Sequence, residues 1–125
     1  MDWLIDTNIL IDHLRGVPRA TAFLRKARKQ QTLWVSVITV AEIHAGRRMK
    51  QSKERAAVVR FLKLFRVVYL DGAIAVKGGE IVRDHSTALP DALIAATAIS
   101  KGLKLATRNT RRFQGISDLI LESPY

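Results

Sequence analysis

The sequence predicts an α/β fold in which helices cover both faces of a central, mostly parallel sheet. Short apolar segments alternate with longer amphipathic ones along the chain, and strands that alternate with helices are typical of βαβ units. The chain contains no internal repeat, linker or low-complexity segment. Its 125 residues can bury a core of their own, so we expect residues 1–125 to form a single domain.

Two strands and a helix are predicted in the first 35 residues. The segment Asp2–Ile5 favours a short strand, which ends at the polar triplet Asp6–Asn8 before Ile9–Ile11 resume the apolar pattern. Residues 19–30 carry apolar side chains three and four positions apart, and this is the stripe of an amphipathic helix. The apolar run Leu33–Val35 then predicts a second strand.

The middle of the chain predicts three helices and one strand. Ser36 can cap a helix that runs to about Met49, and residues 53–65 repeat the helical spacing of apolar side chains. The β-branched and aromatic run Val67–Leu70 predicts a strand. Residues 72–85 favour a helix, although two consecutive glycines weaken it.

The last third of the chain predicts one strong helix and two strands. The helix covers Asp91–Lys101, with a proline directly before it and a glycine directly after it. Strands are expected at Leu103–Thr107 and Leu119–Leu121, and residues 108–117 are typical of a loop. Because ligands bind beyond the carboxyl ends of parallel strands, the residues that follow each strand are the first candidates for a functional site.

An excess of basic residues indicates a polyanionic partner. The chain has 21 Lys and Arg against 11 Asp and Glu, which gives a formal net charge of +10. Such a field attracts nucleic acid first, and an acidic protein or an anionic membrane surface next.

Several classes of protein are excluded by composition. With no cysteine, the chain cannot form disulfides, thiolate nucleophiles or Cys–zinc sites. No apolar stretch approaches the ~18 residues of a membrane span, and the first residues lack the basic region of a signal peptide. We therefore expect a soluble cytoplasmic protein without a membrane partner.

Three acids stand out because they lie in apolar surroundings. Asp6 directly follows the first predicted strand, Glu42 lies in the apolar segment 35–43, and Asp91 begins an apolar helix. An acid in such surroundings needs a partner or a metal ion. Each also has a purely structural explanation: Asp6 as an N-cap, Asp91 as a partner of the helix dipole, and Glu42 on a narrow solvent-facing strip.

Carboxylates that meet in one pocket repel each other, and a divalent cation removes that repulsion. Mg²⁺ and Mn²⁺ prefer carboxylate and water oxygens, and they promote phosphoryl displacement by activating water. An acidic, metal-binding hole within a basic surface is the electrostatic arrangement that a nuclease needs. The three acids and the net charge together favour a metal-dependent nuclease.

Four sequence blocks make this interpretation more specific. DTNILID at 6–12, SVITVAEIHAG at 36–46, LPDALIAATA at 89–98 and ATRNTRRF at 106–113 resemble, in this order, the motif blocks of PIN-domain nucleases, in particular those of VapC-type toxins. The resemblance covers essentially the whole chain. It implies a three-layer α/β/α fold, Mg²⁺- or Mn²⁺-dependent endonucleolytic cleavage of RNA, a cognate antitoxin whose C-terminal segment covers the site, and a homodimer.

The resemblance assigns the catalytic and metal-binding site to Asp6, Glu42 and Asp91. It implies that Asp6 and Asp91 are the main metal ligands, that Glu42 binds the metal directly or through water, and that the metal orients and deprotonates the attacking water. The fourth block departs from the family pattern, since Asn109 and Arg112 stand where further acids are common. Asn109 can offer a neutral oxygen as a fourth ligand, whereas Arg112 cannot bind a cation. We therefore expect weaker occupancy of a second metal.

Polar and basic residues around these blocks have candidate supporting roles. Those expected to orient carboxylates or waters, or else to act as caps and turn residues, are Thr7, Asn8, Ser36, Thr39 and Thr107. Those expected to contact RNA are Arg108, Arg111 and Arg112. The basic clusters Arg25–Lys29 and Arg47–Arg55 form either an RNA backbone path or solvated helix faces. The apolar stretch 58–65 is a candidate surface for the dimer or the antitoxin, unless it packs in the core.

Two other functions are compatible with the sequence. A catalytically weak or inactive PIN-like domain would bind RNA or an antitoxin without cutting, and the missing fourth acid favours it. A phosphoryl-transfer or phospho-acceptor domain would share the acid after the first strand, but a phosphatase of the DxDxT kind would have an acid in place of Asn8. The histidines at 13, 44 and 85 show no metal-ligand spacing, which favours structural or exposed positions for them.

Overall fold

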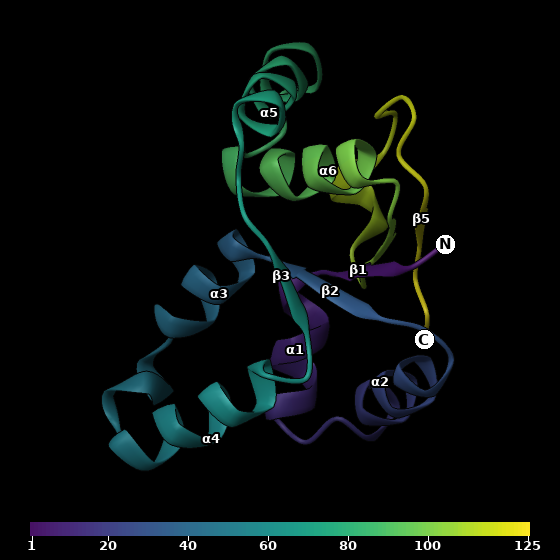
Figure 1. Cartoon of the computed structure of the whole chain (residues 1–125). Coiled ribbons are helices and arrows are strands. Elements are labelled where there is room, and N and C mark those ends of the chain that lie inside the picture. Colours follow the sequence, from purple (N-terminus) through teal and green to yellow (C-terminus); the bar gives the residue numbers. More distant parts are fainter.

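Five parallel strands form the sheet at the centre of the computed structural model, which describes all of residues 1–125 (Figure 1). Their order across the sheet is β3-β2-β1-β4-β5, so the first strand lies in the middle. The strands are β1 (Trp3–Ile5), β2 (Leu33–Ser36), β3 (Arg66–Val68), β4 (Lys104–Ala106) and β5 (Leu121–Glu122). The α-helices are α1 (Thr7–Leu14), α2 (Pro18–Gln30), α3 (Val37–His44), α4 (Ser52–Leu62), α5 (Gly72–His85) and α6 (Leu89–Lys101). The two 3₁₀ turns are η1 (Arg47–Lys50) and η2 (Thr110–Phe113).

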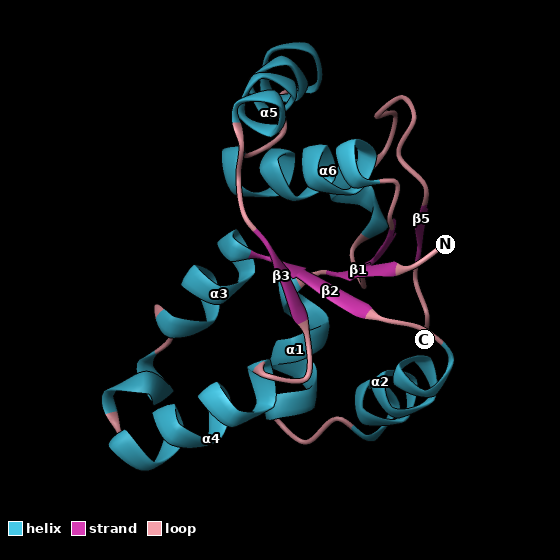
Figure 2. Cartoon of the chain, viewed as in Figure 1, coloured by secondary structure: helices cyan, strands magenta, loops and turns pink.

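Helices lie on both faces of the sheet, which confirms the predicted α/β/α class (Figures 1 and 2). One core cluster joins Trp3 and Ile5 of β1 to apolar side chains of α1, α2 and α4. A second cluster, on the opposite face, joins Leu4 to apolar side chains of α5 and α6. Because successive residues of a strand point to opposite faces, β1 contributes to both cores, and all three of its residues are buried.

The register of the central strands brings distant residues together at one edge of the sheet. Ile5 of β1 pairs with Ala106 of β4, and the backbone N–H of Asp6 donates to the carbonyl oxygen of Ala106 at 2.8 Å. Asp6 and Thr107 therefore leave neighbouring strands side by side. This edge is formed by the carboxyl ends of the strands, where α/β proteins place their ligands.

The predicted helix from residue 36 to residue 49 is wrong in its second half. Helix α3 ends at His44, and the 3₁₀ turn η1 follows Gly46. Glycine is a poor helix former, and a Cβ at position 46 would lie 3.2 Å from the carbonyl oxygen of Ile43. The chain therefore turns at this glycine and does not continue the helix.

Other elements differ less from their predicted bounds. The predicted helix 53–65 is observed as α4, which ends earlier, at Leu62. Phe65 lies in the turn that follows and packs in the core. The strand predicted at 67–70 is observed as β3, which begins one residue earlier and ends two residues earlier. The strand predicted at 119–121 is observed as β5, which shares only Leu121 with it. The apolar pattern after the first strand forms the short helix α1, and the predicted loop 108–117 contains η2.

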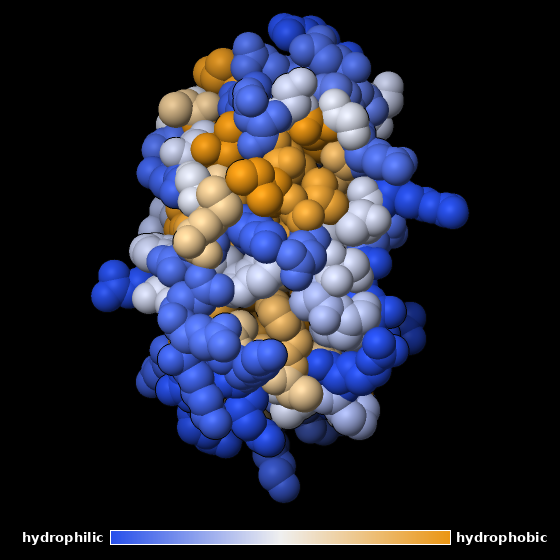
Figure 3. Space-filling model, turned by 90° about the vertical axis from the view of Figure 1, so that its right-hand side faces the viewer, coloured by the Kyte–Doolittle hydropathy of each residue, from blue (hydrophilic) through white to orange (hydrophobic).

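Hydrophilic side chains cover most of the surface. Figure 3 shows one face of the molecule, on which such side chains surround two areas of apolar atoms. The apolar stretch 58–65 is divided between core and surface, since Val58, Leu62 and Phe65 are buried while Val59 and Leu64 are exposed. No helix is long and apolar enough to cross a membrane.

The packing of α5 on α6 depends on a buried glycine. A Cβ added at Gly78 would lie 2.7 Å from Cδ2 and 3.6 Å from Cα of Leu93 in α6, whereas one added at Gly79 would meet no heavy atom within 4 Å. Helix α6 carries Asp91 in its first turn. The close approach at Gly78 therefore helps to set the position of that acid.

We expect opposite effects from substitutions at these two neighbouring glycines. Gly78→Val should lower the free energy of unfolding by about 1–3 kcal/mol, because the added groups overpack the contact between the helices. Gly79→Ala should raise it by about 0.5–1 kcal/mol, because alanine is a better helix former and the position is open. Urea unfolding of both variants measures the difference, and equal effects would contradict this account of the packing.

Candidate active site

Asp6 is a buried carboxylate at the end of the central strand. It follows β1 and directly precedes α1, and only 1% of its surface is exposed. Its Oδ1 accepts a hydrogen bond from the backbone N–H of Thr7 at 2.8 Å, so Asp6 is the N-cap of α1. The structural explanation of Asp6 as a cap is therefore correct, but it accounts for only one of the two carboxylate oxygens.

The second oxygen of Asp6, Oδ2, binds two donors from the C-terminal part of the chain. The hydroxyl of Thr107 donates to it at 2.7 Å, and Nη2 of Arg112 donates to it at 2.7 Å. Burial raises the pKa of Asp6 above its ordinary value of 3.8, while the hydrogen bond from Thr107 and the charge of Arg112 act in the opposite direction. The ionised form of Asp6 thus depends on these donors.

Arg112 connects Asp6 to Asp91. Its Nη1 donates to Oδ1 of Asp91 at 2.6 Å while its Nη2 is bonded to Asp6. Asp91 lies in the first turn of α6, and Arg112 belongs to η2. The fold therefore brings the two aspartates to one place, as the sequence predicted, but with a guanidinium between them.

Glu42 is not part of the network that Arg112 forms with the two aspartates. It is exposed on α3, as its structural explanation requires, and its Oε1 accepts a hydrogen bond from the hydroxyl of Thr7 at 2.7 Å. The same hydroxyl lies 2.9 Å from Oγ1 of Thr39. No hydrogen bond or ion pair joins Glu42 to either aspartate, and its role as a metal ligand stays a prediction.

Several other predicted site residues have local roles. Ser36 caps α3 by accepting a hydrogen bond from the N–H of Ile38 at 3.0 Å. Oδ1 of Asn8 accepts one from the N–H of Arg108 at 3.4 Å. The guanidinium carbon of Arg108 lies 4.4 Å from the centre of the Tyr125 ring, so this side chain has a cation–π partner within the chain.

Asn109 and Arg111 are exposed beside the site. The backbone N–H of Asn109 donates to Oγ1 of Thr107 at 3.1 Å, so the backbone of Asn109 lies beside one of the donors of Asp6. The assignment of Asn109 as a fourth ligand and of Arg111 as an RNA contact stays a prediction.

The pairing of Arg112 with both aspartates was missed by sequence reasoning, which assigned this side chain to RNA. The signal was present, because a base stands in the fourth block where related blocks have an acid. A base beside two buried acids is a candidate for a charge-assisted pair. The contact joins residues that are 106 positions apart, so no local pattern marks it.

The donor chemistry of this site fits a hard divalent cation. Asp6 and Asp91 offer the carboxylate oxygens that Mg²⁺ and Mn²⁺ prefer, and both aspartates contact one guanidinium. They are the residues that would hold the ion, with Glu42 as the candidate third. No three His, Asp or Glu side chains lie close enough together to form a metal site as they stand, and Arg112 supplies the positive charge between the aspartates.

Comparison with known families identifies this architecture. A family model described as the PIN domain matches residues 3–119. The chain belongs to the PIN domain family. It is 41% identical to Ribonuclease VapC10 of Mycobacterium tuberculosis over 115 residues, which are 88% of this chain and 84% of the relative. It is 31% identical to the tRNA(fMet)-specific endonuclease VapC of Shigella flexneri, over 98% of this chain and 97% of the relative.

Solved structures share the fold of this PIN domain along its whole length. One is a toxin–antitoxin complex from Klebsiella pneumoniae, with a TM-score of 0.78 and 31% identity over 100% of this chain and 98% of that one. Another is a DNA-bound VapBC from Salmonella typhimurium, with a TM-score of 0.84 and 26% identity over 100% and 99% of the two chains. The family resemblance predicted from the four sequence blocks is confirmed.

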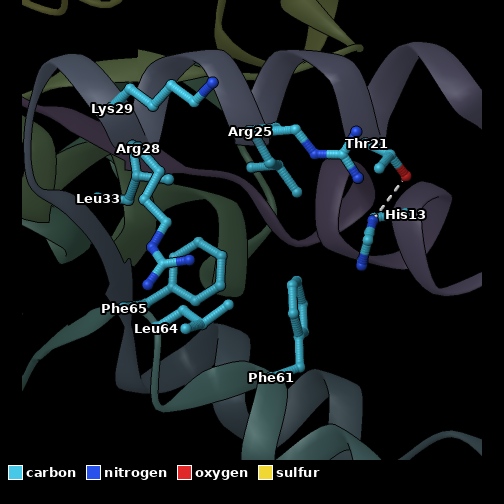
Figure 4. A pocket seen from close by; sticks show the side chains of 10 residues that line it. His13, Thr21, Arg25, Arg28, Lys29, Leu33, Phe61, Leu64 and Phe65 are labelled. Atoms are coloured by element: carbon cyan, nitrogen blue, oxygen red, sulfur yellow. Dashed lines mark hydrogen bonds between the residues drawn. The ribbon is translucent and has the colours of Figure 1, made fainter.

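A separate pocket of about 370 Å³ lies on the PIN domain between α1, α2 and the end of α4. Figure 4 shows the basic side chains of Arg25, Arg28 and Lys29 on one side of it, and Phe61 and Phe65 on the other. The pocket thus combines the predicted basic cluster 25–29 with the apolar stretch 58–65. None of its lining residues is one of the three candidate acids.

His13 lines this pocket in a structural position, as expected. Its ring stacks on that of Phe61 with the centres 4.6 Å apart, and its Nδ1 lies 2.7 Å from Oγ1 of Thr21. Burial and the charge of Arg25 lower the pKa of His13 below its ordinary value of 6.5. The neutral imidazole is therefore favoured in this pocket.

The hydroxyl of Thr107 should stabilise the ionised form of Asp6. Because burial raises the pKa of Asp6 from 3.8, ionisation of Asp6 destabilises the native state as the pH rises through that pKa, and each donor offsets part of the loss. Thr107→Val should raise the pKa of Asp6 further and lower the free energy of unfolding by about 1–3 kcal/mol at pH 7. The deficit should shrink near pH 3.5, where Asp6 is protonated.

A matched control for this substitution is Thr97→Val. Thr97 is also buried, but its hydroxyl donates to the carbonyl oxygen of Leu93 in its own helix. Its effect on stability should not depend on pH between 3.5 and 7. Carboxyl ¹³C NMR measures the pKa of Asp6 directly, and an unchanged pKa in Thr107→Val would contradict the prediction.

Proposed function

We propose that this PIN domain is an endoribonuclease that depends on Mg²⁺ or Mn²⁺ and acts in the cytoplasm as the toxin of a toxin–antitoxin pair. The observation that carries the proposal is the pair Asp6 and Asp91, gathered at the carboxyl edge of the sheet of a chain with a net charge of +10. The ribonuclease names of the relatives support the same activity.

Different residues of this chain would bind the cation, fix the carboxylate of Asp6 and accept a hydrogen bond from water. Asp6 and Asp91 would hold the cation, and a bound Mg²⁺ or Mn²⁺ supplies Lewis acidity to a scissile phosphate and to the attacking water. The cap to Thr7 and the bond from Thr107 fix both oxygens of Asp6, which limits the freedom of the carboxylate. Glu42 is held by the hydroxyl of Thr7 and is placed to accept a hydrogen bond from water.

The basic surface would bring RNA to these acids. Arg108 and Arg111 follow β4 on the edge that carries Asp6, and both are exposed. Contacts of this kind with phosphates make binding steeply dependent on salt. The positive charges attract the RNA backbone, and the cation shields it from the carboxylates.

The solved complexes that resemble this chain contain a toxin with its antitoxin, which supports an antitoxin as partner here. The pocket between α1, α2 and α4 is lined by basic side chains on one side and by apolar ones on the other, so it suits a segment that carries both apolar and acidic side chains. A homodimer is proposed as the basic unit of the toxin.

A second candidate function is favoured by Arg112. A guanidinium that binds both aspartates reduces the tendency of the site to take up a cation, and a domain without a cation would bind RNA or an antitoxin without cutting. This catalytically inactive domain differs from the nuclease in one measurable respect, which is metal-dependent cleavage.

Cleavage of structured RNAs in Mg²⁺ or Mn²⁺ against EDTA tests the proposed function. Asp6→Asn and Asp91→Asn should each lower the rate by about 100-fold or more, since even groups that only orient metal ligands affect activity by 10–100-fold. Asp118→Asn is the control, because Asp118 is exposed with a positive φ of 67° that asparagine also adopts.

Cleavage that persists in EDTA, or that survives in both Asp6→Asn and Asp91→Asn, would contradict the proposed mechanism. Salt-sensitive RNA binding without cleavage in either metal, across several classes of RNA, would support the inactive binding domain instead. The purified protein must be free of antitoxin for either result to count.

A further inference from the structure

Arg112 uses the same carboxylate groups that a divalent cation would need. Nη2 of Arg112 lies 2.7 Å from Oδ2 of Asp6, and Nη1 lies 2.6 Å from Oδ1 of Asp91. Oδ1 of Asp6 accepts the cap from Thr7, and Oδ2 also accepts the hydroxyl of Thr107. Three of the roughly four acceptor sites of the Asp6 carboxylate are thus engaged, and a cation that binds the two oxygens bonded to Arg112 must displace its guanidinium.

The charges favour exchange with a dication. The two aspartates carry two negative charges when ionised, and the guanidinium supplies a single positive charge. A divalent cation brings two positive charges to the same place. Burial makes the remaining negative charge costly, because a group shielded from water interacts more strongly with its neighbours than an exposed one does.

The position of Arg112 is also incompletely satisfied. Its Nε is buried and has no hydrogen-bond partner, although a buried polar group without one is costly. The side chain as a whole is still 34% exposed, so the guanidinium reaches the aspartates from the surface. Rotation of the side chain outward would hydrate Nε and free both carboxylates without unfolding η2.

We propose that Arg112 is an internal counter-cation, which competes with the divalent metal for Asp6 and Asp91 and so sets the metal concentration at which the site fills. The inference rests on the proposed function for the identity of the site, but it concerns metal binding and not cleavage. In the absence of metal, Arg112 holds both aspartates through its two ion pairs.

Calorimetric titration of Mn²⁺ into the native protein and into Arg112→Gln tests the competition. Removal of two charge-assisted hydrogen bonds to the carboxylates should tighten Mn²⁺ binding by about tenfold or more. The matched control is Arg83→Gln. Arg83 also pairs with an aspartate, Asp84, at 2.8 Å, but on the exposed surface of α5, so its loss should leave Mn²⁺ affinity unchanged.

Thermal unfolding gives a second readout that does not depend on activity. Without metal, Arg112→Gln should unfold at a lower temperature than the native protein, because the buried carboxylate of Asp6 and the partly buried one of Asp91 lose their cation. Added Mn²⁺ should raise the unfolding temperature of Arg112→Gln by more than it raises that of the native protein, since at a given concentration a more tightly bound ligand stabilises the folded state more. A purely structural ion pair predicts the first effect without the second.

Arg112→Lys keeps the test decisive if Arg112→Gln does not fold. Lysine keeps a positive charge near the aspartates, but a single ammonium nitrogen replaces the two-pronged guanidinium. Mn²⁺ should bind this variant more tightly than it binds the native protein. Equal or weaker binding in the folded Arg112 variants would overturn the proposal.

The two proposals fail separately. Native protein that cuts RNA with Mn²⁺, while the Arg112 variants bind Mn²⁺ no more tightly, refutes the competition and keeps the nuclease. Tighter Mn²⁺ binding in the variants, with no cleavage of RNA by native protein or variants, supports the competition and refutes the nuclease. No Mn²⁺ binding in native protein and variants alike refutes both the competition and the metal-dependent mechanism.

Discussion

The burial of one carboxylate at the end of the central strand governs this site. Asp6 is almost fully removed from water, and burial alone raises its pKa. Three donors offset that effect: the first N–H of α1, the hydroxyl that follows β4, and the guanidinium of η2. The first belongs to the residue next to Asp6. The other two lie 101 and 106 residues away in the sequence, and they reach Oδ2 of Asp6 because β4 is adjacent to β1 in the sheet. The order of the strands in the sheet is therefore needed to stabilise the ionised carboxylate of Asp6.

How far the sequence predicts this molecule depends on the range of the interactions involved. The α/β/α class follows from the alternation of short and long apolar segments, and the strand-end rule located Asp6. Asp91 was found by a different signal, as an acid at the start of an apolar helix. The predicted end of a helix was wrong where a single residue decides it, as at Gly46. The pairing of Arg112 was not predicted, because a contact between side chains so far apart in the sequence produces no periodic pattern of residues. Glu42 lies in an apolar stretch but is exposed, because only part of α3, with Thr39 and Ile43, is buried.

Structural and chemical roles coincide in the same side chains here. Asp6 caps a helix with one oxygen and pairs with a base through the other, while Thr107 serves that same carboxylate and also accepts the N–H of Asn109. The base Arg112 joins the two aspartates, so the side chain that holds the acids together is also the one that balances part of their charge.

The distance along the chain between Asp6 and its donors has a consequence for synthesis on the ribosome. Its bonds to Thr107 and Arg112 span 101 and 106 residues, so both donors leave the ribosome long after Asp6 does. A contact between distant segments can form only when the later segment is present. A nascent chain that has not yet reached Arg112 therefore carries Asp6 without the partners that stabilise its charge, and the acidic site is assembled only after η2 has been synthesised.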